Sequence, residues 1–266
     1  MKHKGLIITL IILLSIVVFF LVMFLVMCLK GGISFKNGIF SFGTKSTNMI
    51  YDKEFELQDI KDIAIKQDAG DITIKETTED YIKVVLYGEN EEDAKVELNN
   101  GKLNIDNSHS KKGFSFFSFG GKKNDIIVYL PSDYSNEIKI ENDAGECKIA
   151  DFENATANIN CDAGNVELGK IKNAVLQCDY GNIEIKEITN KCDIKADCGN
   201  IEVDTISIKE NSSIKADLGN IEINNTNDIY IEANVDLGET NINKNNRNAE
   251  VTLKVNCDCG NVTINN

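Results

Sequence analysis

The sequence holds 266 residues, with 28 basic and 42 acidic side chains and a formal net charge of −14. A chain this acidic lacks the basic surface that nucleic-acid binding requires, so no nucleic acid is expected as a partner. Anionic lipid and polyphosphate surfaces should repel it for the same reason.

Residues 5–29 form an apolar run of 25 residues without a charge. As a helix it would span about 37 Å, more than the roughly 30 Å of a bilayer's hydrocarbon core. The run is too long for a cleavable signal peptide, and no small residue stands at its end. Lys2 and Lys4 favour a cytoplasmic N-terminus. We therefore predict a single-pass anchor in the cell membrane, with residues 1–4 in the cytoplasm and residues 30–266 outside it.

The next two segments differ in pattern. Residues 30–57 contain Gly, Ser and Phe without a clear element, and are predicted to form a tether. Residues 58–133 show the alternation typical of strands, but no regular repeat, and are expected to form an irregular β front section. Within that section, Asn100-Gly101 between alternating runs predicts a hairpin, and Pro131 marks the end of a strand.

A repeat centred on Asp-x-Gly fills residues 134–266. Its seven Gly residues are 17 to 22 residues apart, and an eighth copy, QDAGDITIK, lies earlier at Gly70. The Asp–Gly pairs of the seven regular copies are Asp143 and Gly145, Asp162 and Gly164, Asp179 and Gly181, Asp197 and Gly199, Asp217 and Gly219, Asp236 and Gly238, and Asp258 and Gly260.

Apolar and polar residues alternate on both sides of each repeat Gly; Ile183 and Ile185 flank Glu184, for example. This pattern predicts two short strands joined at Asp-x-Gly, where Gly permits a positive φ and Asp accepts backbone N–H bonds. A unit of about 19 residues cannot bury its apolar face alone, but stacked units can. The sequence therefore predicts an all-β fold, a single-stranded right-handed β-solenoid of the β-helix type, behind one N-terminal transmembrane helix.

Two further expectations follow from stacking. Asn follows the repeat Gly in five copies, so a ladder of stacked amides is expected. Its members are Asn165, Asn182, Asn200, Asn220 and Asn261. The last coil runs to Asn266, so its strand edge is expected to be open to a partner strand or to self-association with a second copy.

The strand ending in Leu130-Pro131-Ser132-Asp133, followed by serial Asp-x-Gly units, resembles the bacterial putative-adhesin domain, a toast-rack-like β-repeat family of unknown function. The resemblance covers residues 58–266. It implies an all-β repeat domain, often tethered to a membrane and sometimes linked to envelope-stress signalling, with no established catalytic residues. Family members usually carry Ser or Thr before the repeat Gly, where this chain has Asp-x.

Cysteines and carboxylates are the candidate chemical groups. Most of the Cys positions alternate with Ala, Val and Leu in other copies, which favours small buried hydrophobes; a bridge between Cys161 and Cys178 is the alternative. Without a Cys-x-x-Cys pair or a His cluster, no metal and no cofactor is expected. The Asp column is interpreted as turn-capping rather than as a Ca²⁺ site. The seven Cys outside the anchor are Cys147, Cys161, Cys178, Cys192, Cys198, Cys257 and Cys259.

Catalytic motifs are missing from the sequence: His3 and His109 are its only His residues, and it has no nucleophile elbow or phosphate loop. Two functions remain, namely binding or scaffolding at the cell envelope and a regulatory part in a membrane complex that senses envelope stress. The expected partners are the membrane and an envelope protein or cell-wall polymer. A Phe-rich loop is predicted to cover the end of the solenoid or to contact a membrane partner; it holds Phe114, Phe116, Phe117 and Phe119.

Overall fold

The computed structural model describes residues 48–88, 94–108 and 124–265, and two short strands, β1 (Ile33–Lys36) and β2 (Ile39–Phe42). Strands β1 and β2 pair antiparallel and belong to a separate unit, Met1–Ser46 with Lys112–Lys122. The predicted anchor and the four Phe residues of the predicted loop lie outside the described residues. In the part of the chain that is described, no helix has the length and apolar character needed to cross a bilayer.

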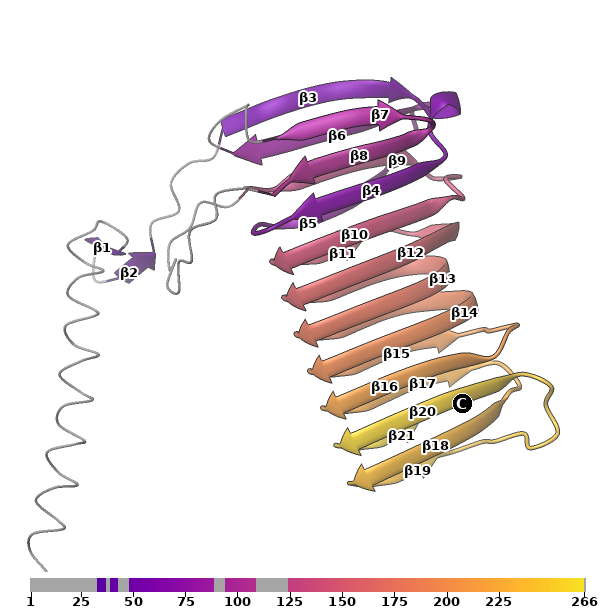
Figure 1. The fold of residues 1–266 in the computed structure, drawn as a ribbon. Helices are drawn as coiled ribbons and strands as arrows, with labels where there is room; N and C mark the ends of the chain where they lie inside the picture. Colours follow the sequence, from indigo (N-terminus) through magenta and orange to yellow (C-terminus); the bar gives the residue numbers. More distant parts are fainter. Residues whose placement is uncertain (1–32, 37–38, 43–47, 89–93, 109–123, 266) are drawn as a thin grey trace, which may run out of the picture. The chain divides into compact units, whose positions relative to one another are not determined.

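The second unit is an array of parallel strands in which each repeat contributes one strand before its Gly corner and one after it (Figure 1). Strands β10 and β11 of one coil pair in parallel with β12 and β13 of the next. The all-β, repetitive architecture predicted from the sequence is therefore confirmed.

The strands before the corners are β4 (Asp62–Gln67), β8 (Lys102–Asn107), β10 (Glu137–Ala144), β12 (Phe152–Ala163), β16 (Ser212–Leu218), β18 (Tyr230–Leu237) and β20 (Thr252–Cys259). Those after the corners are β5 (Ile72–Thr77), β9 (Ile126–Pro131), β11 (Cys147–Ile149), β15 (Ile201–Ile206), β17 (Ile221–Thr226), β19 (Thr240–Ile242) and β21 (Val262–Ile264). The longer strands β13 (Val166–Tyr180) and β14 (Ile183–Cys198) run from one corner to the next.

The core runs along the whole array between the two rows of strands. Ile140, Ile159 and Leu176 are Cα partners in three successive coils, and all three are buried. Because alternate residues of a strand face the same way, equal spacing from the corner places apolar side chains in columns. Burying these columns is the main stabilising contribution that a single coil could not obtain by itself.

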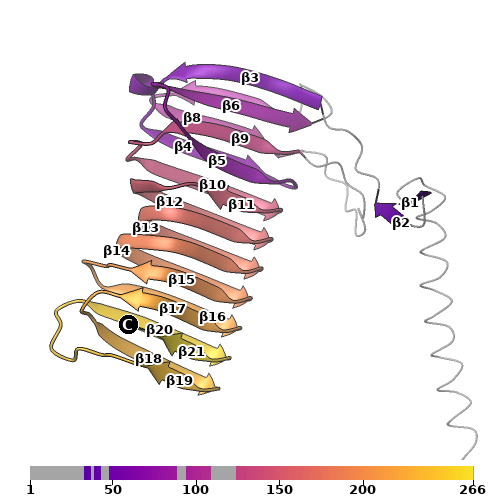
Figure 2. The same cartoon turned by 180° about the vertical axis from the view of Figure 1, so that it is seen from behind.

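The coils do not follow the sequence order to the end of the array. Strand β16 pairs with β20 rather than β18, and β18 pairs with the other side of β20; β17, β21 and β19 follow the same order (Figures 1 and 2). The expectation that the C-terminal coil forms the open edge is therefore wrong, because that coil has neighbours on both sides. The outermost coil is the one formed by β18 and β19.

A difference in apolar content explains this exchange. Toward the core, the C-terminal coil places Val255 and Val262, both fully buried. Their Cα partners in the outer coil are Ala233 and Thr240, which are smaller or more polar. The coil with the larger apolar side chains gains more from having neighbours on both faces, so it takes the inner position.

The front section is more regular than its sequence suggests. Strands β4 and β5, around Gly70, pair with β10 and β11, while β8 and β9 add a further layer beyond them. The predicted hairpin is confirmed: β7 (Lys95–Asn99) pairs antiparallel with β8, and Asn100 and Gly101 have φ values of 54° and 84°.

Antiparallel strands cover this end of the array. Strand β3 (Asn48–Glu56) pairs with β6 (Tyr81–Gly88), and β6 pairs with β9. A short 3-10 helix, Leu57–Asp59, connects β3 to β4. β3 lies within the range 30–57, for which the sequence pattern predicted a tether, so the folded array begins before residue 58.

Candidate interaction surfaces

The Gly corners stack so closely that a side chain has no room. At Gly219, φ is 149°, and an added Cβ would lie 1.9 Å from the carbonyl oxygen of Gly199. Its N–H donates to the carbonyl oxygen of Cys259 at 3.0 Å. The other corner Gly residues have the same positive φ and the same contact with a backbone neighbour. The repeat Gly is therefore a steric requirement of the stack.

The Asn residues after the corners form a ladder. The side-chain oxygen of Asn200 accepts from the N–H of Asn220, that of Asn220 from Asn261, and that of Asn261 from Glu239, at 2.9 to 3.0 Å. The Asn residues form the column that the repeat spacing predicts. However, each bond joins an Asn side chain to a backbone N–H of the neighbouring coil, and not to another amide side chain. Each Asn thus caps an N–H of the neighbouring corner.

Two of the repeat Asp carboxylates bond to side chains. Asp179 accepts from the Gln177 side chain at 3.2 Å, and Asp197 pairs with Lys195 at 2.6 Å. These partners are side chains two residues earlier, not backbone N–H groups of the turn. Across the described ranges, no group of three or more His, Cys, Asp or Glu side chains is arranged to hold a metal ion.

An exposed apolar column that the repeat pattern did not predict runs along the corners. The residue before each Gly is apolar in every coil, and three of these side chains are large and exposed: Tyr180 (66%), Leu218 (54%) and Leu237 (70%). Cys198 stands between the first two, and Cys259 between the last two. The signal in the sequence is the apolar residue between Asp and Gly in Asp-x-Gly. In a single repeat it is only a turn residue, and it forms a column only when the coils stack.

The cysteines divide by position. Five are buried, as predicted, but Cys198 is half-buried and Cys259 is exposed, so the buried interpretation is wrong for these two. Both belong to the corner column, where the side chain points outward. All seven are free thiols, including Cys161 and Cys178, which are Cα partners in adjacent coils. Burial raises the pKa of Cys192 to about 12, so its thiol is unreactive at neutral pH.

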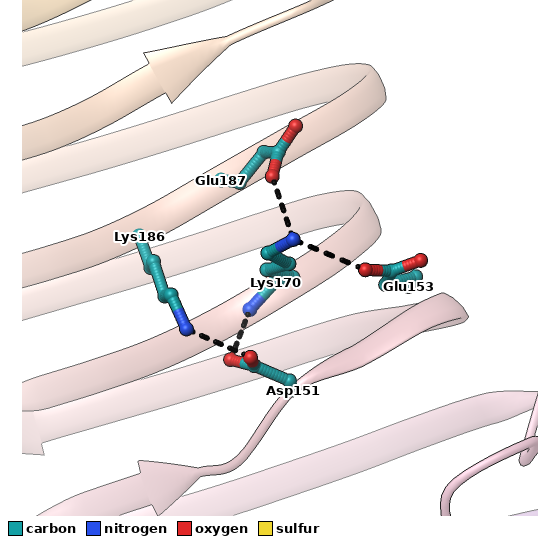
Figure 3. A network of polar contacts seen from close by, with 5 residues as sticks. All are labelled: Asp151, Glu153, Lys170, Lys186 and Glu187. Atoms are coloured by element: carbon teal, nitrogen blue, oxygen red, sulfur yellow. Dashed lines mark hydrogen bonds and ion pairs between the residues drawn. The ribbon is translucent and has the colours of Figure 1, made fainter.

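The charged face carries ion pairs between coils (Figure 3). Lys170 Nζ lies 3.2 Å from a carboxylate oxygen of Glu153 and 3.5 Å from one of Glu187. Asp151 pairs with Lys186 at 2.8 Å and accepts from the backbone N–H of Lys170 at 3.0 Å. The hydrogen bond from Lys186, opposed by partial burial and helped by the Lys170 N–H, lowers the pKa of Asp151.

The hollows found on the described surface are open and shallow. One of about 340 Å³ lies over β14, β16, β18 and β20, and its lining includes Lys191, Asp193, Ser213, Tyr230 and Lys254. Another, of about 220 Å³, lies among the exposed Glu residues of β13, β14 and β15. Neither encloses a ligand as enzyme clefts do.

Stacked parallel coils with Gly corners and exposed polar and apolar columns define an all-β repeat protein. The chain belongs to the Toastrack DUF4097 family, whose model matches residues 60–266. No curated protein matches it significantly. It is similar in fold to a putative adhesin from Bacteroides fragilis, with 14% identity and a TM-score of 0.51, covering 82% of this chain and 98% of that one. A putative cell adhesion protein from Clostridium sporogenes also matches, with 14% identity, a TM-score of 0.39, and 83% and 99% coverage.

Proposed function

We propose that this protein is anchored in the cell membrane by residues 5–29 and uses its repeat domain, outside the cytoplasm, for binding or scaffolding at the cell envelope, without catalysing a reaction. The observation that carries this proposal is the array itself. Its described surface offers long columns of regularly spaced side chains and shallow hollows, which suit extended contacts better than they suit a small substrate. The names of the structural relatives, as adhesins, agree with a binding role.

We also propose that the coil winds right-handed. Connections between parallel strands of one sheet are right-handed in about 98% of cases. Because each coil returns to a parallel neighbour through the opposite row of strands, the same geometric preference applies to it. An experimental electron-density map of the array would settle the hand.

A regulatory part in a membrane stress-sensing complex is the second candidate. It is favoured by the place of the Phe-rich segment in the sequence, between β8 and β9. These two strands lie at the same end of the array as β3, its first strand. The Phe side chains of the segment would give a membrane partner an apolar surface to contact.

The orientation is tested with Cys259, whose thiol is exposed. Intact cells that express the protein with Cys28→Ser are treated with a membrane-impermeant maleimide. Labelling is expected, and it should be lost when Cys198→Ser and Cys259→Ser are added. Labelling only after the cells are lysed would place the repeat domain in the cytoplasm and overturn this part of the proposal.

The binding role is tested by crosslinking intact cells and purifying the tagged full-length protein. The control is a tagged chain of residues 1–57, which keeps the predicted anchor and lacks nearly all of the array. Recovery of a wall polymer or envelope protein with the full chain, and not with the control, is expected. A stoichiometric membrane kinase would favour the regulatory candidate instead, and identical recovery with both chains would contradict a binding role for the array.

A further inference from the structure

The outer coil leaves one end of the core incompletely covered. Strand β18 pairs only with β20, and β19 only with β21, among the strands that the structure describes. In the neighbouring coil Val255, Cys257 and Ile264 are fully buried. Their counterparts in the outer coil, including Val235 and Ile242, are only partly buried, and Leu237 is 70% exposed. Strands β18 and β19 form this end of the array (Figure 2), so strand backbone and the partly buried apolar side chains are available there together.

The backbone of β18 shows where a further strand could pair. The N–H of Tyr230 donates to Val251 beside β20, so the alternate residues Ile231, Ala233 and Val235 direct their polar groups away from β20. Asn245 occupies the first of these positions. Its side chain accepts from the N–H of Ile231 at 2.9 Å and donates to the carbonyl oxygen of Ile231 at 2.7 Å.

The Asn245 side chain thus replaces a neighbouring strand at Ile231, which is one way proteins protect sheet edges. Ala233 and Val235 have no such cap among the hydrogen bonds of the described residues. The pairing positions that remain lie next to exposed Leu237, where the apolar corner column ends. A strand added there would find backbone partners and an apolar contact at once.

The charge of the outer coil selects the partner. Residues 230–243 carry Glu232, Asp236 and Glu239, and no Lys or Arg. In two inner coils the repeat Asp pairs with a Lys two residues before it, as Lys215 does with Asp217 at 2.6 Å. In the outer coil Asn234 stands at that position, as Asn160 and Asn256 do in two other coils, so Asp236 has no Lys neighbour of this kind.

A second copy of the chain fits this edge poorly. Two β18 strands paired antiparallel about Asn234 would place Glu232 of each copy opposite Asp236 of the other. Like charges directly opposite one another destabilise a strand pair. Glu232 pairs with Lys254 of β20 at 3.7 Å, so an extended segment with Lys or Arg would instead satisfy Asp236 and Glu239.

We propose that the edge formed by β18 and β19 binds an extended basic segment of a protein partner by strand addition. The segment pairs with Ala233 and Val235, packs an apolar side chain against Leu237, and directs Lys or Arg toward Asp236 and Glu239. Backbone hydrogen bonds supply affinity in this mode of recognition, and the alternate side chains supply specificity. The inference rests on the proposed binding function and names the chemistry of its partner.

The test uses the full-length protein in detergent micelles and a fluorescent peptide, Lys-Val-Lys-Val-Lys-Val-Lys, followed by anisotropy. The N–H of Ala233 points away from β20, so Ala233→Pro removes it without removing a hydrogen bond to that strand. Pro is also tolerated on strand edges. Asp236→Lys reverses an exposed charge and carries little folding risk. Both variants are expected to weaken binding about ten-fold or more, as loss of a pairing position or of a charge contact would. The matched control Glu222→Lys, on an inner coil, should bind like the wild type.

Three results would overturn the inference. Unchanged binding by Ala233→Pro and Asp236→Lys would exclude the edge. An equal loss with Glu222→Lys would show that the peptide only senses the overall charge. A concentration-dependent dimer in sedimentation that Ala233→Pro abolishes would make a second copy the occupant. If the purification from cells recovers a partner whose binding these variants leave intact, the proposed function stands and the inference alone fails.

Discussion

The side-chain oxygen of Asn220 accepts a hydrogen bond of 2.9 Å from the backbone N–H of Asn261, a residue 41 positions further along the chain. Every other Asn-to-Asn step of this ladder spans 17 to 20 residues. The long step is the point at which the C-terminal coil inserts beside β16 and β17. It carries the ladder across the change in coil order without a break.

Disulfide trapping tests this order. In a Cys198→Ser background, Leu218→Cys should form a disulfide with Cys259 under mild oxidation, because these positions are Cα partners. Neighbouring strands lie about 4.8 Å apart, within the roughly 7 Å that a disulfide spans. Peptide mapping by mass spectrometry identifies the bond, and adding Cys259→Ser should abolish it. If the coils followed the sequence order, the two positions would be two strand spacings apart and no such bond would form.

Removing a corner Gly should destabilise the array. In Gly219→Ala the new Cβ would lie 1.9 Å from the carbonyl oxygen of Gly199, which is backbone and cannot turn away. We expect the free energy of unfolding in urea to fall by about 2 kcal/mol or more. The adjacent exposed variant Leu218→Ala should change it by less than about 0.5 kcal/mol. Equal midpoints for the two variants would show that the corner tolerates a side chain.

Thiol reactivity should follow exposure. In a Cys28→Ser protein at pH 8, a small disulfide reagent should modify Cys259 first and Cys198 more slowly. Cys192 should react only after unfolding, because burial raises its pKa to about 12 and shields it from the reagent. Mass spectrometry of quenched samples measures the order. Equally fast modification of Cys192 and Cys259 in the folded protein would contradict the burial of the inner column.

Acidification should remove the contribution of the Asp151 ion pair. The pKa of Asp151 is lower in the folded protein than in the unfolded chain, so its stabilisation is complete above the unfolded pKa of about 3.9. It is lost as pH falls through the folded pKa. Because the carboxylate is partly exposed, Asp151→Asn should cost less than about 1 kcal/mol at pH 7. The cost is measured by urea unfolding.

The same comparison at low pH completes this prediction. Below the folded pKa of Asp151, wild type and Asp151→Asn should unfold alike, since both side chains are then neutral. Glu222→Gln, on the exposed face of β17, serves as the control for loss of a negative charge without loss of this network. A difference between wild type and Asp151→Asn that stays constant from pH 7 to strong acid would contradict the role of the charge.

The sequence predicts some features of the candidate interaction surface but not others. The Gly corners and the Asn column follow from residues at constant spacing. The apolar corner column has a clear sequence signal, but it acquires meaning only when Tyr180, Leu218 and Leu237 are seen to point outward. Cys198 and Cys259 share their positions with these residues, so the same outward direction places two thiols at the surface.

The sequence by itself determined the coil. Alternation of apolar and polar residues specifies two strands, and Gly at constant spacing specifies where they turn, because both are local properties of the backbone. Only the tertiary structure decided which coil lies beside which. Since the repeats resemble one another, each can pair with several others, and the choice depends on how much apolar surface each buries along the array. That competition placed β20 and β21 inside and left β18 and β19 at the edge.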